Sequence, residues 1–173
     1  MQRRNLCLLM FAWIPLAACG GGSTPTNPTV TPIRAVIQAT GNGALVVHPS
    51  LDPSLAFALE TPLEIRETAG GAVDWTFARF ALFQDGVEIE GGELGTSAIQ
   101  AAGFGRINPN TTINPVLVFR FGATQFNGVS FTLGFTDINL GESFVRDVPL
   151  RVFTGVDQSA TPLSNPGGQV RQQ

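Results

Sequence analysis

A regular alternation of apolar and polar residues constrains the fold of this chain more than any other feature. The segment VSFTLGFT, residues 129–136, places an apolar side chain at every second position. This period of two is typical of a strand with one buried face and one solvated face. No segment has a convincing helical period. The pattern therefore predicts an all-β fold built from antiparallel strands.

The same pattern recurs along the chain, interrupted by turn residues. In the segment 55–65 it is broken by Pro62, which predicts an edge position or a bulge because proline cannot donate to a ladder. Seven to nine short strands at these intervals predict an antiparallel β-sandwich. The expected strands lie in the segments 33–37, 45–47, 55–65, 73–82, 87–90, 116–121, 129–136 and 148–152.

Two local signals refine the segment 73–90. Val73, Trp75 and Phe77 share one phase, whereas Phe80 and Leu82 share the other, which predicts a bulge at Ala78-Arg79 and an inward Trp75. Asp85-Gly86 is a dipeptide typical of two-residue hairpin turns.

The first eighteen residues have the pattern of a secretory signal peptide. A basic stretch at 1–5 precedes an apolar run at 6–18, which is shorter than the roughly 20 residues that a spanning helix needs. The alternative, a buried N-terminal helix, is disfavoured because the run has no amphipathic pattern.

The residues Leu16-Ala17-Ala18-Cys19 resemble the lipobox of bacterial lipoproteins. The resemblance implies cleavage between Ala18 and Cys19, a diacylglyceryl group on the Cys19 thiol, and stable attachment to a membrane through two or more acyl chains. Because Gly20 rather than aspartate follows the cysteine, it also favours the outer membrane of a bacterial cell envelope. Cys7 leaves with the signal peptide, so the mature chain is expected to have no free thiol and no disulfide.

Composition divides the remaining chain into three parts. Residues 19–32 are rich in Gly, Ser, Thr and Pro and are expected to form an extended tether after the lipidated cysteine. Residues 33–155 are expected to form the sandwich, and residues 156–173 a disordered tail.

The charge balance argues against nucleic acid as a partner. The chain has 10 basic residues, all arginine, and 13 acidic ones. Loss of Arg3 and Arg4 with the signal peptide leaves 8 against 13, a formal charge of −5. A mildly acidic domain without a basic run is a poor match for a phosphate backbone.

The segment Leu63–Glu90 resembles bacterial immunoglobulin-like domains, including the adhesion-related CARDB kind. In those domains an apolar strand leads to a turn similar to Asn/Glu-Thr-Gly-Gly, and then to a long strand that ends in a Phe/Tyr-x-x-Asp-Gly hairpin. The corresponding residues here are Thr-Ala-Gly-Gly and Phe-Gln-Asp-Gly. The resemblance implies an immunoglobulin-like sandwich that serves as a spacer or binding module. Because one fold hosts many functions, it assigns none.

Catalytic candidates are few. His48, with Ser50 and Asp52 nearby, lies in a Pro-rich segment, and we expect an exposed loop rather than a Ser-His-Asp triad. Gly103-Phe104-Gly105-Arg106 lacks the third glycine of a dinucleotide loop. We therefore expect no enzyme activity and no cofactor.

The segment Thr136–Ser143 holds the weak metal candidates Asp137, Asn139 and Glu142 around Gly141. Its glycine comes one position too early for a calcium loop of the EF-hand type, so a polar turn without metal is favoured. Glu88, Glu90 and Glu93 are expected on a solvent face, and Asn110-Thr111-Thr112, although a glycosylation pattern, in a loop.

Three functional hypotheses follow. The favoured one is a non-catalytic, lipid-anchored envelope module that binds a protein or glycan partner or has a structural role. A carbohydrate-binding or adhesive module is the alternative, and it requires exposed aromatic residues such as Phe104 and Phe126. A hydrolytic enzyme, which would gather His48 and carboxylates in a cleft, is the least favoured.

Overall fold

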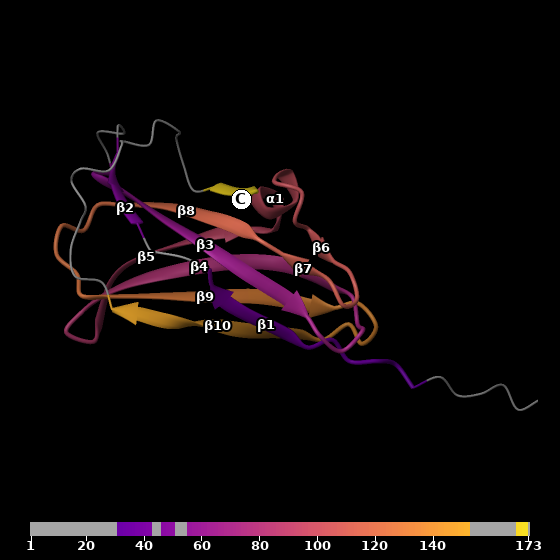
Figure 1. Cartoon of the computed structure of the whole chain (residues 1–173). Helices are drawn as coiled ribbons and strands as arrows, with labels where there is room; N and C mark the ends of the chain where they lie inside the picture. The colour runs from indigo at the N-terminus through magenta and orange to yellow at the C-terminus, as the bar shows by residue number, and fades with distance from the viewer. Residues whose placement is uncertain (1–30, 43–45, 51–54, 153–168, 173) are drawn as a thin grey trace, which may run out of the picture. The chain divides into compact units, whose positions relative to one another are not determined.

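Two antiparallel sheets face each other in the computed structural model, which confirms the all-β sandwich (Figure 1). The structure describes residues 31–42, 46–50, 55–152 and 169–172. All of them belong to one compact unit that begins at Thr31.

The first sheet has six strands, and its central strand is β3. Strand β3 pairs with β8, which in turn pairs with β11. On its other side β3 pairs with β2 through its first half and with β1 through its second half. The strands are β1 (Ile37–Gly41), β2 (Val46–Pro49), β3 (Phe57–Glu67), β7 (Thr112–Ile113), β8 (Pro115–Phe121) and β11 (Gln169–Gln172).

The second sheet has five strands in the order β10-β9-β4-β5, with β6 paired to the start of β4. Strands β10 and β5 are therefore its two described edge strands. The strands are β4 (Val73–Gln84), β5 (Val87–Gly95), β6 (Arg106–Ile107), β9 (Gly128–Asp137) and β10 (Ser143–Val152).

Phenylalanine fills much of the space between the sheets. Phe80 of β4 meets Phe119 of β8 with ring centroids 4.6 Å apart, and Phe119 lies 6.1 Å from Phe131 of β9. The alternation predicted for β9 is confirmed, because Val129, Phe131, Leu133 and Phe135 all face this core. Trp75 is fully buried, as the sequence predicted.

Side chains also join the two sheets at their edges. The Glu90 carboxylate of β5 accepts the N–H groups of Gly122 and Ala123, which follow β8. At the opposite edge the Nε of Arg146 in β10 donates to the Ile37 carbonyl of β1 at 3.1 Å. These bonds hold the sheets together without closing them into one barrel.

The predicted hairpin is confirmed, but the predicted bulge lies two residues earlier. Asp85 and Gly86 have φ angles of 52° and 81°, which suit a two-residue turn. The register of β4 against β9 shifts between Trp75 and Phe77 rather than at Ala78-Arg79. The Thr96 hydroxyl donates to the carbonyl of Thr76, and the Trp75 indole N–H donates to the carbonyl of Phe77. At the register shift, side-chain donors therefore bind these two backbone carbonyls of β4.

Pro62 lies neither on an edge strand nor at a bulge. It pairs with Val116 in the interior of the sheet, at the point where the partner of β3 changes from β2 to β1. The carbonyl of Pro62 accepts the N–H of Asn42, just beyond β1. A residue without an N–H fits at this interruption of the neighbouring ladder.

Three further differences concern elements. The described residues form eleven strands rather than seven to nine, because several are only two to four residues long. A helix, α1 (Thr96–Ala101), buries only Ile99, and one buried residue leaves no helical period. Residues 169–172 form β11 rather than a disordered tail, because they pair with β8 and bury Val170.

No described helix is long and apolar enough to span a bilayer.

Candidate functional site

Two buried carboxylates fix the N-terminal segment 31–36 to one end of the sandwich. We call this the proximal end and define it by the segments 31–36, 68–72, 108–111 and 137–142. The opposite end, at the Asp85-Gly86 hairpin, is the distal end. Each carboxylate is the last residue of a strand, followed by a turn.

Glu67 ends β3 and is completely buried. Its Oε1 accepts the N–H groups of Val36 and Ala69 at 3.1 and 2.9 Å. Its Oε2 accepts those of Gly70 and Asn110 at 2.9 and 2.8 Å. Burial acts to raise the pKa of Glu67, but these four backbone donors outweigh it and lower the pKa to about 2.

Asp137 ends β9 and repeats the arrangement. Its Oδ2 accepts the N–H of Ala35 at 2.7 Å, and its Oδ1 accepts those of Asn139 and Leu140 at 2.8 and 3.1 Å. Burial again opposes ionisation, but the backbone donors and the charge of Arg34 lower the pKa of Asp137 below its ordinary value. Both acids are thus ionised anchors for the segment 31–36.

The weak metal candidates have structural roles in the described proximal end. Asp137 is occupied by three N–H donors, and Asn139 donates its side-chain amide to the Ile33 carbonyl at 2.9 Å. Glu142 is exposed and pairs with Arg34 at 2.8 Å. Among the described residues, no three His, Cys, Asp or Glu side chains are grouped so that they could hold a metal ion.

The sequence carries a signal for both buried acids. Glu67 continues the inward phase of Leu63 and Ile65, and Asp137 continues that of Leu133 and Phe135. Each acid is the last inward-facing residue of its strand and is followed by a turn. Its carboxylate accepts the backbone N–H groups of the residues two and three positions later.

The solvent-facing side of the five-stranded sheet forms a second candidate site, here called the outer face. It contains a shallow hollow of about 130 Å³. An ion pair between Arg79 and Glu88, 2.6 Å long, lies at the hollow. Its lining combines charged, hydroxyl and apolar side chains: Arg79, Ala81, Phe83, Glu88, Ser130 and Thr132.

Phe77 also belongs to the outer face, which corrects the inward phase predicted for it. Because the ladder slips between Trp75 and Phe77, Phe77 pairs with Gly134 and its ring covers that glycine. A Cβ atom at Gly134 would lie 2.0 Å from Cε1 of the ring. The outer face therefore presents two partly exposed aromatic rings, Phe77 and Phe83, that the sequence pattern did not identify.

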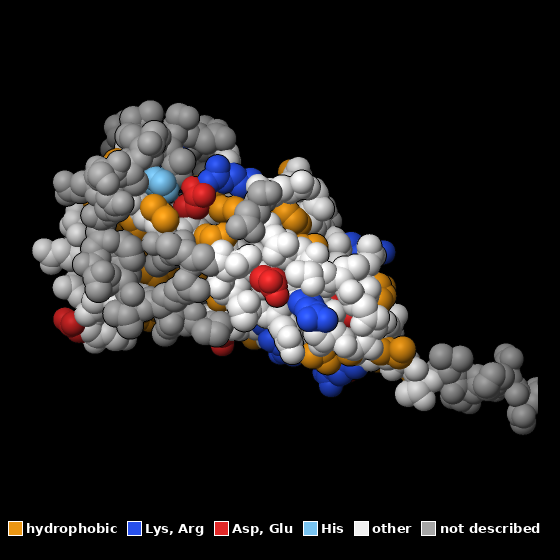
Figure 2. Space-filling model, viewed as in Figure 1, with side chains coloured by type: hydrophobic (Ala, Val, Ile, Leu, Met, Phe, Trp, Pro, Cys, Tyr) orange, Lys and Arg blue, Asp and Glu red, His pale blue; other side chains and the backbone are white. Residues whose placement is uncertain are grey.

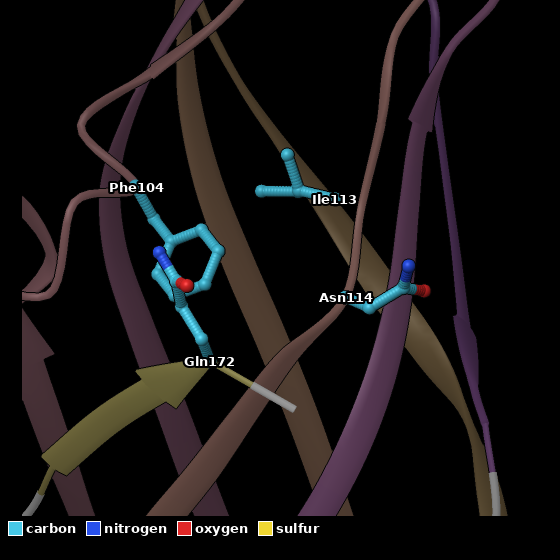
Figure 3. A pocket seen from close by; sticks show the side chains of 4 residues that line it. All are labelled: Phe104, Ile113, Asn114 and Gln172. Atoms are coloured by element: carbon cyan, nitrogen blue, oxygen red, sulfur yellow. The ribbon is translucent and has the colours of Figure 1, made fainter.

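An open depression of about 370 Å³ lies beside β11 (Figure 3). Gln172 and Phe104 lie close together on one side of it, and Ile113 and Asn114 lie across from them. The carbohydrate-binding alternative required an exposed Phe104, but this residue is buried against Trp75, with ring centroids 6.4 Å apart. Phe126 is half-buried and packs edge-on against Phe121.

His48 lies in β2 rather than in an exposed loop, with a side chain that is 15% exposed. Its Nε2 is 3.7 Å from Oε2 of Glu60, which also pairs with Arg171 of β11. Ser50 bonds to the buried Arg120. Asp52 lies outside the described residues, so the structure gives no geometry for the triad that was disfavoured.

The remaining candidates have simple placements. Glu88 and Glu93 are exposed as expected, whereas Glu90 is half-buried and binds backbone N–H groups beyond β8. Asn110 lies in a loop with a positive φ of 55°. Ala18, Cys19 and the signal peptide lie outside the described residues.

Comparisons with known proteins do not identify a family. No protein-family model matches the chain, and no curated protein matches it. A solved structure that resembles it is that of the putative ApaA protein from Bordetella pertussis, with 11% identity and a TM-score of 0.45. The similarity covers 75% of this chain and 99% of that chain. A likeness at this level assigns neither a family nor a function.

Proposed function

We propose that the protein is a lipid-anchored bacterial envelope lipoprotein whose immunoglobulin-like sandwich is a non-catalytic interaction or structural module. Cys19 carries the lipid, residues 20–32 form the tether, and the domain faces the periplasm or the cell exterior from the outer membrane. No cofactor takes part.

The proposal rests mainly on the sequence Leu16-Ala17-Ala18-Cys19 behind a basic and apolar leader. The proximal end adds a structural argument. The chain that comes from Cys19 meets the domain at Thr31–Val36, where two buried carboxylates and the Arg34–Glu142 pair hold it. These contacts fix the point at which the proposed tether joins the domain.

Replacement of Cys19 tests the lipid anchor. We expect Cys19→Ala to abolish lipid modification, so that the protein no longer partitions with membranes. Cys7→Ala is the matched control, because it removes the other cysteine and leaves the lipobox intact. Intact mass and membrane fractionation measure the result. Unchanged membrane association of the Cys19→Ala protein, or an unmodified mature N-terminus in the wild type, contradicts the proposal.

A glycan-binding module is the second candidate, and the outer face favours it. Sugar-binding sites combine an aromatic face, which covers C–H groups, with charged and hydroxyl groups that bond to sugar hydroxyls. Phe83 lines the hollow of the outer face together with charged and hydroxyl side chains: Arg79, Glu88, Ser130 and Thr132. Phe77 lies on the same face, two residues before Arg79 in β4.

Purified envelope polysaccharide tests this second candidate in a co-sedimentation assay. We expect Phe83→Ala to weaken binding at least tenfold, and Glu64→Ala, on the other sheet, to leave it unchanged. Equal sedimentation of both variants with the wild type, or no sedimentation of the wild type, rejects the glycan-binding role.

A further inference from the structure

Among the described residues, four of the seven exposed large apolar side chains lie at the proximal end, and the other three, Val87, Ile89 and Val145, lie on β5 and β10. Ile33, Val36, Ile138 and Leu140 are 54%, 40%, 38% and 37% exposed. These four residues are here called the apolar rim. Figure 2 shows hydrophobic side chains, with arginines nearby, at the end of the domain from which the N-terminal segment leaves.

Hydrogen bonds hold the rim together as one surface. The Asn139 amide bonds to the carbonyl of Ile33, which places Ile33 beside the turn that carries Ile138 and Leu140. The N–H of Thr68 bonds to the carbonyl of Val36. Glu67 and Asp137 bind the backbone N–H groups of Val36 and Ala35, so the segment that carries Ile33 and Val36 is held in place with these side chains exposed.

The charges differ between the two ends. Arg34, Arg66 and Arg106 lie at the proximal end and are exposed, with Glu142 and Asp74 as the partners of Arg34 and Arg106. The distal hairpin and strand β5 carry Asp85, Glu88, Glu90 and Glu93, with Arg79 paired to Glu88. With the buried Glu67 and Asp137 included, the three proximal arginines face four carboxylates, whereas the distal hairpin and β5 set four carboxylates against one arginine. A membrane surface with anionic lipids therefore repels the distal end more strongly than the proximal end.

The length of the tether also favours the proximal end. Eleven residues separate Cys19 from Thr31, and at polyproline pitch they reach about 35 Å. The twelve residues of β4 run from the proximal to the distal end, a length of about 40 Å at strand rise. The proximal end can therefore reach the bilayer with a slack tether, whereas the distal end would need the tether fully stretched back along the domain.

We infer that the proximal end lies on the bilayer, with the apolar rim inserted among the lipid headgroups and the proximal arginines near their phosphates. This inference rests on the proposed lipidation of Cys19. Contact at the proximal end gives the domain a fixed orientation on the bilayer. The distal hairpin then points away from the membrane, and the outer face is roughly perpendicular to the membrane plane.

Tryptophan scanning of the lipidated, full-length protein in vesicles tests the orientation. Leu140→Trp reports on the rim, and Val87→Trp, at a distal residue that is 65% exposed, is the matched control. The vesicles contain phosphatidylethanolamine and phosphatidylglycerol with brominated acyl chains, which quench a tryptophan that lies in the bilayer. Trp13 leaves with the proposed signal peptide, and Trp75 is fully buried in the core, so the background is the same in both variants.

We expect bromolipid to quench the Leu140→Trp emission at least twofold more than the Val87→Trp emission, with a blue shift in the former only. Equal quenching of both variants, whether strong or weak, overturns the inference. Ile138→Trp replaces Leu140→Trp if the latter does not give the wild-type thermal transition.

Intact mass and vesicle flotation of the same samples separate the two proposals. If the protein carries lipid and floats with the vesicles but the rim tryptophan is not quenched, the lipid anchor is supported and the inferred orientation is contradicted. A protein without lipid that does not float contradicts the anchor itself.

Discussion

Asp137 accepts the backbone N–H of Ala35 at 2.7 Å and so joins two residues that are 102 positions apart in the sequence. One position further, Val36 donates to Glu67, 31 residues away. Two consecutive N–H groups of the N-terminal segment are thus bound by buried carboxylates from opposite sheets. The folded domain therefore begins with a segment that is held by charge-assisted bonds before its first strand pairs.

Removal of the Glu67 charge should destabilise the domain strongly. In Glu67→Gln one carboxylate oxygen becomes an NH₂ group, which cannot accept and which faces N–H donors. We expect a loss of about 3 kcal/mol in the free energy of unfolding, measured by urea denaturation. Glu64→Gln, at an exposed position of the same strand, is the control and should change the free energy by less than about 0.5 kcal/mol. Similar losses in both variants would show that the buried bonds contribute little.

The pKa of Glu67 predicts an acid-sensitive stability. Its folded-state pKa is about 2, below its ordinary value of 4.5, so the ionised form is favoured by folding. The contribution is fully present above about pH 4.5 and is lost as the pH falls towards 2. Asp137 acts in the same direction. Thermal melts between pH 6 and 2 should show a falling melting temperature, with a shallower fall in Glu67→Gln. Parallel pH profiles of the two proteins would contradict this assignment.

Gly71 should not tolerate a side chain. A Cβ atom there would lie 2.7 Å from the backbone nitrogen and 2.8 Å from the Cα of Ala35, in a segment that cannot move without breaking the carboxylate bonds. We expect Gly71→Ala to cost about 2 kcal/mol in the free energy of unfolding. Gly122→Ala is the control, since a Cβ there meets no atom within 4 Å. If Gly71→Ala and Gly122→Ala have the same free energy of unfolding, the segment 31–36 is less firmly held than the structure indicates.

Strand β11 should contribute measurably to stability. Truncation after Gly168 removes Val170 from the core and four residues that pair with β8. We expect a loss of about 2 kcal/mol, because one buried valine is worth roughly that amount. Removal of Gln173 alone keeps β11 and serves as the control. Identical denaturation curves for the two truncations would support the disordered tail that composition predicted.

Period-two patterns predicted the sandwich because burial on one face leaves a direct trace in the sequence. The alternation of β9, the Asp85-Gly86 turn and the inward Trp75 all depend on local geometry. The sequence pattern did not predict that Phe77 faces outward, because this depends on the register shift at Thr76. The carbonyl of Thr76 accepts a hydrogen bond from the hydroxyl of Thr96, which lies twenty residues further along the chain. Strand β11 was missed because a single buried residue, Val170, does not make a pattern.

The candidate sites were harder to predict than the fold for a related reason. The metal candidates Asp137, Asn139 and Glu142 have the right chemistry for a cation, but Asp137 and Asn139 bond to the distant segment 33–35. The apolar rim joins Ile33 and Leu140, which only the folded chain brings together. Contacts between remote segments leave no periodic signal in one sequence.

The β5 edge of the five-stranded sheet bears on how copies of this domain can associate. Strand β5 departs from the ladder at Ile89, where Leu82 pairs with Glu90 and Phe83 with Glu88. It also carries three glutamates and two adjacent glycines. An irregular, negatively charged edge resists zipping onto the same edge of another molecule. Two copies that meet at their β5 edges would thus repel each other rather than pair into one continuous sheet.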